Sequence, residues 1–151
     1  MRYVPILVLC ALPMAPARAD DAEAFREIGA VLGWRLAAPT LEANCRVLDP
    51  GGAAVRKKSL ETWTSKNAAL IKSVDDRVAE VVPLLLAGEN TAHPVADVED
   101  HVRTMLLESL TPEICKAERD PSRHTWTNNG LPHVQEALAA LYDWQMSRAA
   151  R

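Results

Sequence analysis

Residues 53–86 read AAVRKKSLETWTSKNAALIKSVDDRVAEVVPLLL and carry the clearest pattern in the chain. Their apolar side chains recur at steps of three and four, apart from one wider gap, which is the spacing of one face of an α-helix. This stripe consists of Leu60, Trp63, Leu70, Val74, Val78, Val81 and Leu85. The pattern predicts one long helix. Pro83 should kink it or end it one turn earlier, because proline removes a backbone donor.

Asn67 falls in the gap of this stripe, on the same face as the apolar residues. A buried amide must find hydrogen-bond partners or cost about 1–3 kcal/mol. Asn67 therefore has two interpretations. It either makes a structural hydrogen bond across the core, or it contacts a ligand in a cleft between helices.

Two helices are predicted ahead of this stretch. The first should end before Pro39, since proline disfavours helix in the residue that precedes it. Thr40 can cap a second, shorter helix over residues 41–48. Residues 49–52, Asp-Pro-Gly-Gly, then form a break. The apolar stripe of the first helix is Phe25, Ile28, Leu32 and Leu36.

Three more helices are predicted in the second half of the chain. Residues 94–110 form one of them. Thr111 and Pro112 supply a capping hydroxyl and a proline at the first helical position, which start a short helix through Cys115. Pro132 opens the last helix. The stripe of the 94–110 helix is Val95, Val98, Val102 and either Met105 or Leu106, and that of the last helix is Leu131, Val134, Leu138, Leu141 and Trp144.

The expected fold is all-α, a single compact bundle of five or six helices. No stretch alternates polar and apolar residues as a strand does, and phenylalanine and tyrosine are scarce. Residues 20–151 have the length of one ordinary domain with a core of its own.

Residues 1–19 are interpreted as a signal peptide that is removed on export. Met1 and Arg2 give a basic start, an apolar run of about ten residues follows, and Ala17-Arg18-Ala19 is a small-x-small ending. The apolar run is shorter than the roughly twenty residues that span a bilayer. The expected location is therefore the periplasm or the exterior after cleavage near Ala19, and Cys10 leaves with the peptide.

Two cysteines, Cys45 and Cys115, remain after this cleavage. An even count in an oxidising compartment predicts a disulfide between them. Closing a loop of that size stabilises a fold by roughly 4 kcal/mol in the chain-entropy model. The bond would connect the first part of the domain to its final third.

The charge balance argues against a nucleic-acid partner, which requires a basic surface. Arg2 and Arg18 lie in the predicted signal peptide and no acid does, so the formal net charge of −3 becomes −5 on cleavage. The one basic cluster is Arg56-Lys57-Lys58, which we interpret as a solvated turn at a helix start. No segment is expected to span a membrane.

No metal site, cofactor or catalytic centre is predicted. His133 and Glu136, and likewise Asp97 and His101, have helical spacing, but such pairs are routine surface salt bridges. The chain has no His-Glu-x-x-His, EF-hand or glycine-rich phosphate motif, and no nucleophile elbow. We therefore do not expect an enzyme.

The expected partner-binding segment is the polar stretch 120–130. Trp126 lies in its middle, with Arg123 and His124 before it and Asn128 and Asn129 after it. Tryptophan and arginine are the residues most often found at interface hot spots, so these five form a candidate contact surface. The alternative is that Trp126 folds back and pins the segment to the core.

The leading functional hypothesis is a periplasmic protein that binds another protein in the envelope. A two-cysteine helical exported domain of this size is similar in outline to immunity proteins, inhibitors of lysozyme-like enzymes and small chaperones, although no motif carries the likeness. The alternative is a small-ligand carrier with an apolar cleft between helices near Asn67 and Pro83. An envelope hydrolase that uses unidentified carboxylates ranks third.

Overall fold

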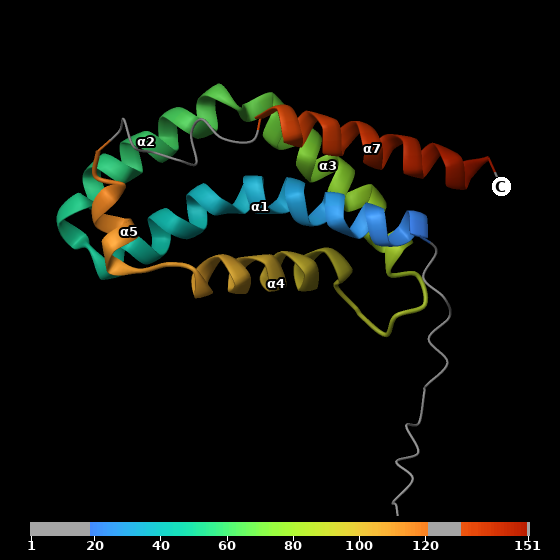
Figure 1. The fold of residues 1–151 in the computed structure, drawn as a ribbon, viewed down its shortest axis with the longest axis horizontal. Helices are drawn as coiled ribbons and strands as arrows, with labels where there is room; N and C mark the ends of the chain where they lie inside the picture. The colour runs from blue at the N-terminus through green and yellow to red at the C-terminus, as the bar shows by residue number, and fades with distance from the viewer. Residues whose placement is uncertain (1–18, 121–130, 151) are drawn as a thin grey trace, which may run out of the picture.

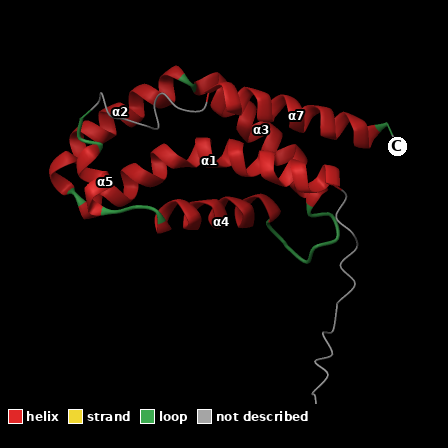
Figure 2. Ribbon diagram, viewed as in Figure 1, coloured by secondary structure: helices red, strands yellow, loops and turns green. Residues whose placement is uncertain are grey.

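The computed structural model describes residues 19–120 and 131–150, and all regular structure in these residues is helical. Figure 2 shows helices and loops and no strand in the described part of the chain, so the all-α prediction is confirmed. None of these helices is long and apolar enough to cross a membrane. The elements are α1 (Ala19–Leu48), a 3-10 turn η1 (Pro50–Gly52), α2 (Ala53–Lys66), α3 (Ala68–Leu85), α4 (Pro94–Glu108), α5 (Pro112–Ala117) and α7 (Leu131–Ala149).

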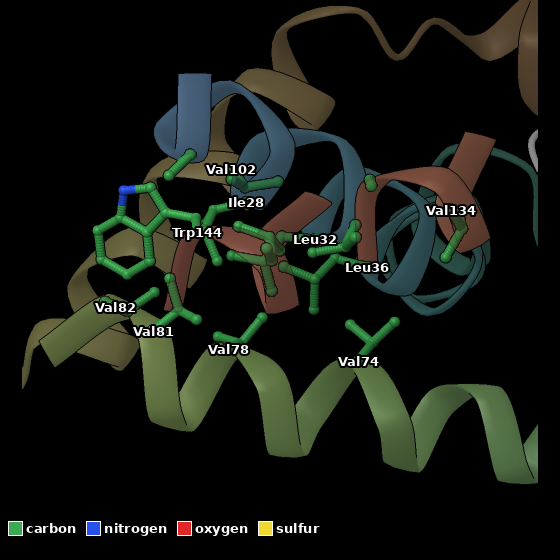
Figure 3. Packing of buried hydrophobic residues seen from close by; sticks show 14 residues of the cluster. Ile28, Leu32, Leu36, Val74, Val78, Val81, Val82, Val102, Val134 and Trp144 are labelled. Carbon is green, nitrogen blue, oxygen red and sulfur yellow. The ribbon is translucent and has the colours of Figure 1, made fainter. Parts of the chain in front are cut away.

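Helix α1 is the central element of the fold. It packs against α4 on one side and against α3 and α7 on the other, while α2 and α5 gather around its C-terminal end (Figure 1). The main core lies where α1, α3, α4 and α7 meet. Figure 3 shows the valines of α3 pointing toward Ile28, Leu32 and Leu36 of α1. The buried members are Ala24, Ile28, Val31, Leu32, Leu36, Val74, Val78, Val81, Val82, Val102, Val134, Ala137, Leu141 and Trp144.

The predicted long helix over residues 53–86 is two helices, because the chain breaks at Asn67. Asn67 has φ −106° and ψ 10°, and its side-chain Nδ2 donates to the carbonyl oxygen of Trp63 at 2.8 Å. The amide thus bonds the backbone one turn earlier, a competition with helical bonding that asparagine often makes. Asn67 is half-buried, the hydrogen bond that its side chain donates stays within its own segment and does not cross the core, and no described contact places it in a ligand cleft.

The same apolar stripe therefore packs on two different clusters. Trp63 of α2 is 4% exposed and packs with Ala38 and Trp34 of α1, with the two indole centroids 5.0 Å apart. Val74 and Val78 of α3 instead join the main core. Helix α3 continues past Pro83 to Leu85, so the predicted early end is wrong; the proline lies in the last turn, where buried Val81 and Val82 hold the helix on the core.

The predicted break at Pro39 is also absent, because α1 runs without interruption from Ala19 to Leu48. Proline inside a helix costs about 3 kcal/mol relative to alanine. Burial on both sides of it offsets this cost, since Ala38, Thr40 and Cys45 are all buried. Packing against the neighbouring helices therefore overrides the local preference.

The core face of α1 is displaced from the predicted stripe by one residue at its start. Phe25 is 39% exposed, and Ala24 and Val31 are buried instead. On α4, Leu106 rather than Met105 packs against the core. The predicted cap of α5 is confirmed, because the Thr111 hydroxyl accepts a hydrogen bond from the amide of Ile114 at 3.3 Å.

Candidate functional site

The predicted contact surface of Arg123, His124, Trp126, Asn128 and Asn129 lies outside the described residues, as does the predicted signal peptide up to residue 18. The described residues contain three other features with chemical content. They are the disulfide, a buried ion cluster beside it, and a groove between α1 and α4.

The disulfide between Cys45 and Cys115 is present, with both residues fully buried and the sulfur atoms 1.95 Å apart. It joins the C-terminal part of α1 to the short helix α5. Since the two cysteines are 70 residues apart in sequence, the bond closes a large loop. The prediction from the cysteine count is confirmed.

The Arg56 guanidinium lies beside this bond and is fully buried. Its Nη1 donates to Asp49 Oδ2 at 2.7 Å and to the Cys115 carbonyl at 3.1 Å. Its Nη2 donates to the Cys45 carbonyl at 2.8 Å and to the Asp49 carbonyl. Its Nε has no hydrogen-bond partner among the described residues. One side chain of α2 thereby bonds the backbone of both disulfide cysteines.

The Asp49 carboxylate also accepts hydrogen bonds from a second arginine, Arg119. Arg119, two residues beyond α5, donates from Nε to Asp49 Oδ2 at 2.8 Å and from Nη2 to Oδ1. The hydrogen bonds from Arg119 and Arg56 hold the pKa of the Asp49 carboxyl far below its usual range. We call Asp49, Arg56 and Arg119 the Asp49 cluster.

Gly52 lets the three side chains of the Asp49 cluster meet. A Cβ built at this position would clash with Arg56 Nη1 and would lie 2.7 Å from Arg119 Cγ and 2.8 Å from Asp49 Oδ2. Any larger residue would push the arginines away from the carboxylate. The glycines that the sequence marks as a break are thus also a requirement for close packing.

The interpretation of Arg56-Lys57-Lys58 as a solvated turn is wrong for its first member. Lys57 and Lys58 are exposed, whereas Arg56 is the largest fully buried side chain among the described residues. The only sequence signal for a buried ion pair was Asp49 and two glycines shortly before Arg56, and this signal is weak. The decisive contacts come from Cys115 and Arg119, which are remote in sequence.

The depressed pKa of Asp49 predicts a loss of stability in acid. Below pH of about 4 the unfolded chain takes up a proton at Asp49 and the folded chain does not, so acid favours unfolding. The contribution of the ionised carboxylate is complete above that pH and is lost as pH falls toward the folded-state pKa. Urea midpoints of the wild type and Asp49→Asn should therefore differ most near pH 7, and the difference should narrow steadily as pH falls below about 4. A difference that stays constant with pH would contradict the ionised cluster.

A groove of about 440 Å³ runs between α1 and the C-terminal half of α4. Its apolar surface comes from Leu36, Pro39, Ala43 and Leu107, and Leu107 is 40% exposed. One helical turn beyond Ala43, Val47 is 82% exposed. The lining is completed by Arg35, Thr40, Asn44, Glu99 and Arg103. We call this surface the α1–α4 groove.

The arginines at the rim of the α1–α4 groove are held by acids outside its floor. Arg35 donates to Asp75 of α3 at 3.0 Å. Arg103 bonds Glu99 at 2.8 Å and Asp100 at 2.7 Å. The groove therefore combines an apolar floor with oriented charged groups at its edge, an arrangement typical of a recognition surface.

Two further hollows lie elsewhere on the surface. One, of about 470 Å³, is lined by Pro83, Val95 and their neighbours in the loop before α4. The other, of about 420 Å³, lies between α1 and α7 beside Trp144 and contains Asp20, Glu23, Glu27 and Asp143. Glu23 and Glu27 are paired with Arg26.

Within the described ranges, no group of three or more histidine, cysteine or acidic side chains is arranged to hold a metal ion. His133 and Glu136 form a surface pair at 3.6 Å. Comparison with protein-family models, curated proteins and solved structures finds no match to this chain. The disulfide, the Asp49 cluster, the α1–α4 groove and the hollow beside Pro83 are the features of the described residues that bear on function.

Proposed function

We propose that this chain is an exported protein that binds another protein in the periplasm or outside the cell, as an immunity protein, inhibitor or accessory factor. The buried disulfide supports an oxidising compartment, because such bonds are rare where thiols are kept reduced. The acidic balance of the chain supports a protein partner over a nucleic acid.

The observation that carries the proposal is the α1–α4 groove. Binding energy at protein interfaces concentrates where an apolar or aromatic anchor enters a pocket that excludes water. Pro39 and Leu107 offer such a surface, and Arg35 and Arg103 stand at its edge to hydrogen-bond a partner's carbonyl or carboxylate groups. Val47 extends the apolar surface toward the end of α1.

The segment around Trp126 remains a second proposed contact. Arg123 and His124 precede Trp126 in sequence and Asn128 and Asn129 follow it, and this mix of an aromatic residue with hydrogen-bonding groups suits an interface anchor. The two surfaces make separate predictions, because each can be altered by one substitution.

Affinity capture from an oxidised envelope extract tests both surfaces, with the chain from Asp20 as bait and mass spectrometry of what binds. We expect Leu107→Glu to lower capture of one stoichiometric protein by about tenfold or more, since it places a charge in the apolar groove. Leu84→Glu is the matched control, because Leu84 is 41% exposed and lies outside the groove. Trp126→Ala tests the second surface in the same way.

Circular dichroism and the melting temperature of each variant should stay close to the wild type. Equal capture by wild type, Leu107→Glu and Trp126→Ala would contradict both surfaces. A large loss of stability in Trp126→Ala would assign that residue to the core. Loss of capture in Leu84→Glu as well would show that the effect is not specific to the groove.

A second candidate function is carriage of a small apolar ligand. The hollow beside Pro83 and Val95 favours it, because its lining includes Ala92, Pro94 and Ala96 and is mostly apolar. Native mass spectrometry of the purified protein separates the two functions. A retained small molecule would support the carrier, and the mass of the unliganded chain alone would count against it.

A further inference from the structure

The Asp49 cluster connects the two cysteines by contacts that do not involve sulfur. Arg56 donates to the carbonyl of Cys45 at 2.8 Å and to that of Cys115 at 3.1 Å, from a side chain that is fully buried. The guanidinium thus bridges α1 and α5 through their backbones, and its rigid fork of donors fixes their separation. The Cα atoms of the two cysteines are 5.2 Å apart.

A second connection between the α1 and α5 segments is the ion pair between Asp49 and Arg119. Arg119 lies two residues beyond α5 and bonds the carboxylate of Asp49, which follows α1 directly. Cys45 and Asp49 are one helical turn apart, and so are Cys115 and Arg119. The disulfide and the Asp49–Arg119 pair therefore join the same two segments at neighbouring turns, with Arg56 between them.

We propose that the Asp49 cluster is a template for the disulfide: it holds the Cys45 and Cys115 thiols side by side before oxidation and makes the bond resistant to reduction afterwards. The cluster and the bond stabilise the same arrangement of α1, α2 and α5. They are therefore thermodynamically linked, and the cluster favours the disulfide by the same factor by which the disulfide favours the cluster.

Thiol–disulfide exchange with glutathione measures this linkage. The thiolate of one cysteine attacks glutathione disulfide and releases one glutathione thiolate, which forms a mixed disulfide. The second cysteine's thiolate then attacks the protein sulfur and releases the other glutathione, so the protein loses two electrons and two protons and glutathione disulfide gains them. The equilibrium constant is the effective concentration of one thiol at the other and does not depend on the pathway.

The experiment equilibrates the purified chain over a range of reduced and oxidised glutathione, then alkylates the free thiols and determines the oxidised fraction by mass. Cys10 is replaced by serine wherever the N-terminal segment is retained. We expect Arg119→Gln to lower the effective concentration about five- to 150-fold, the range of typical coupling between linked sites. Arg56→Lys keeps the charge but loses the fork, and we expect a decrease at least as large.

Arg46→Gln is the matched control. Arg46 is adjacent to Cys45, but its hydrogen bonds go to Glu42 within α1 and do not reach α5. The effective concentration of the thiols in Arg46→Gln should equal that in the wild type within about twofold, a factor worth less than 0.5 kcal/mol. A variant that weakens both redox forms equally leaves the constant unchanged, so a general loss of stability does not imitate the expected result. Wild-type values for both Arg119→Gln and Arg56→Lys would overturn the proposal.

Hydrogen exchange on the unaltered chain tests the template without any substitution in the cluster. After reduction, the amides of Cys115 and Glu118, which donate to Thr111 and Ile114 within α5, should stay protected, because Arg56 and Arg119 still hold that segment. Exchange of these amides at the rate of an unfolded peptide, while α1 and α3 remain protected, would show that the disulfide alone holds α5 and would overturn the proposal.

Discussion

Arg56→Met should lower the free energy of unfolding by about 3–5 kcal/mol, the usual cost of breaking a buried ion pair by removing one partner. Methionine fills much of the same space but donates no hydrogen bond. The carbonyls of Cys45, Cys115 and Asp49 would then lose a buried hydrogen-bond donor, and the Asp49 carboxylate would keep only Arg119. Urea denaturation followed by circular dichroism measures the change.

Lys57→Met is the matched control for this substitution. Lys57 is the next residue in sequence and is exposed, so its replacement should change the free energy of unfolding by no more than about 0.5 kcal/mol. Equal effects of the two substitutions would mean that the buried guanidinium contributes no more than a solvated charge. The contacts assigned to Arg56 would then be wrong.

Trp63→Ala should lower the free energy of unfolding by about 3–5 kcal/mol, as large aromatic side chains do when they are truncated in a core. Trp63 is 4% exposed and packs on Ala38 and Trp34 of α1, so it attaches α2 to the central helix. Its removal leaves a cavity that the backbone on either side cannot fill. The measurement is thermal and urea unfolding of the purified variant.

Phe25→Ala, compared with Trp63→Ala, tests whether the loss in free energy of unfolding depends on the burial of the aromatic side chain. Phe25 belongs to the predicted stripe of α1, but it is 39% exposed, and its truncation should cost about 1 kcal/mol or less. If Phe25→Ala destabilised the chain as much as Trp63→Ala, the core face of α1 would follow the predicted stripe and not the observed one.

The disulfide junction and the α1–α4 groove, the proposed binding surface, lie along the same helix. Cys45 and Asp49 belong to the end of α1 that α2 and α5 surround, whereas Leu36, Pro39 and Ala43 face α4 one to three turns earlier. The disulfide and the Asp49 cluster fix one end of α1, and the core holds the rest of the helix. The groove residues on α1 would therefore already be ordered before a partner binds. Such preorganisation lowers the entropic cost of binding a partner.

Local features of the sequence were sufficient to predict much of this fold. Steps of three and four residues place Val74, Val78 and Val81 on one helix face, and this requires no knowledge of what that face contacts. The Thr111-Pro112 pair starts α5 by capping chemistry within four residues. The pairing of Cys45 with Cys115 follows from the count of two cysteines outside the predicted signal peptide.

The features that the sequence could not predict depend on residues that are far apart in the chain. Pro39 stays helical because side chains on both sides of it are buried by other helices, and the valines of α3 pack on a different cluster from Trp63 of α2. Arg56 is buried because Asp49, Cys115 and Arg119 converge on it, and before folding it resembles its solvated neighbours Lys57 and Lys58. Local propensity contributes less than about 1 kcal/mol per ordinary residue, so the energy of tertiary packing and of buried hydrogen bonds decides such positions.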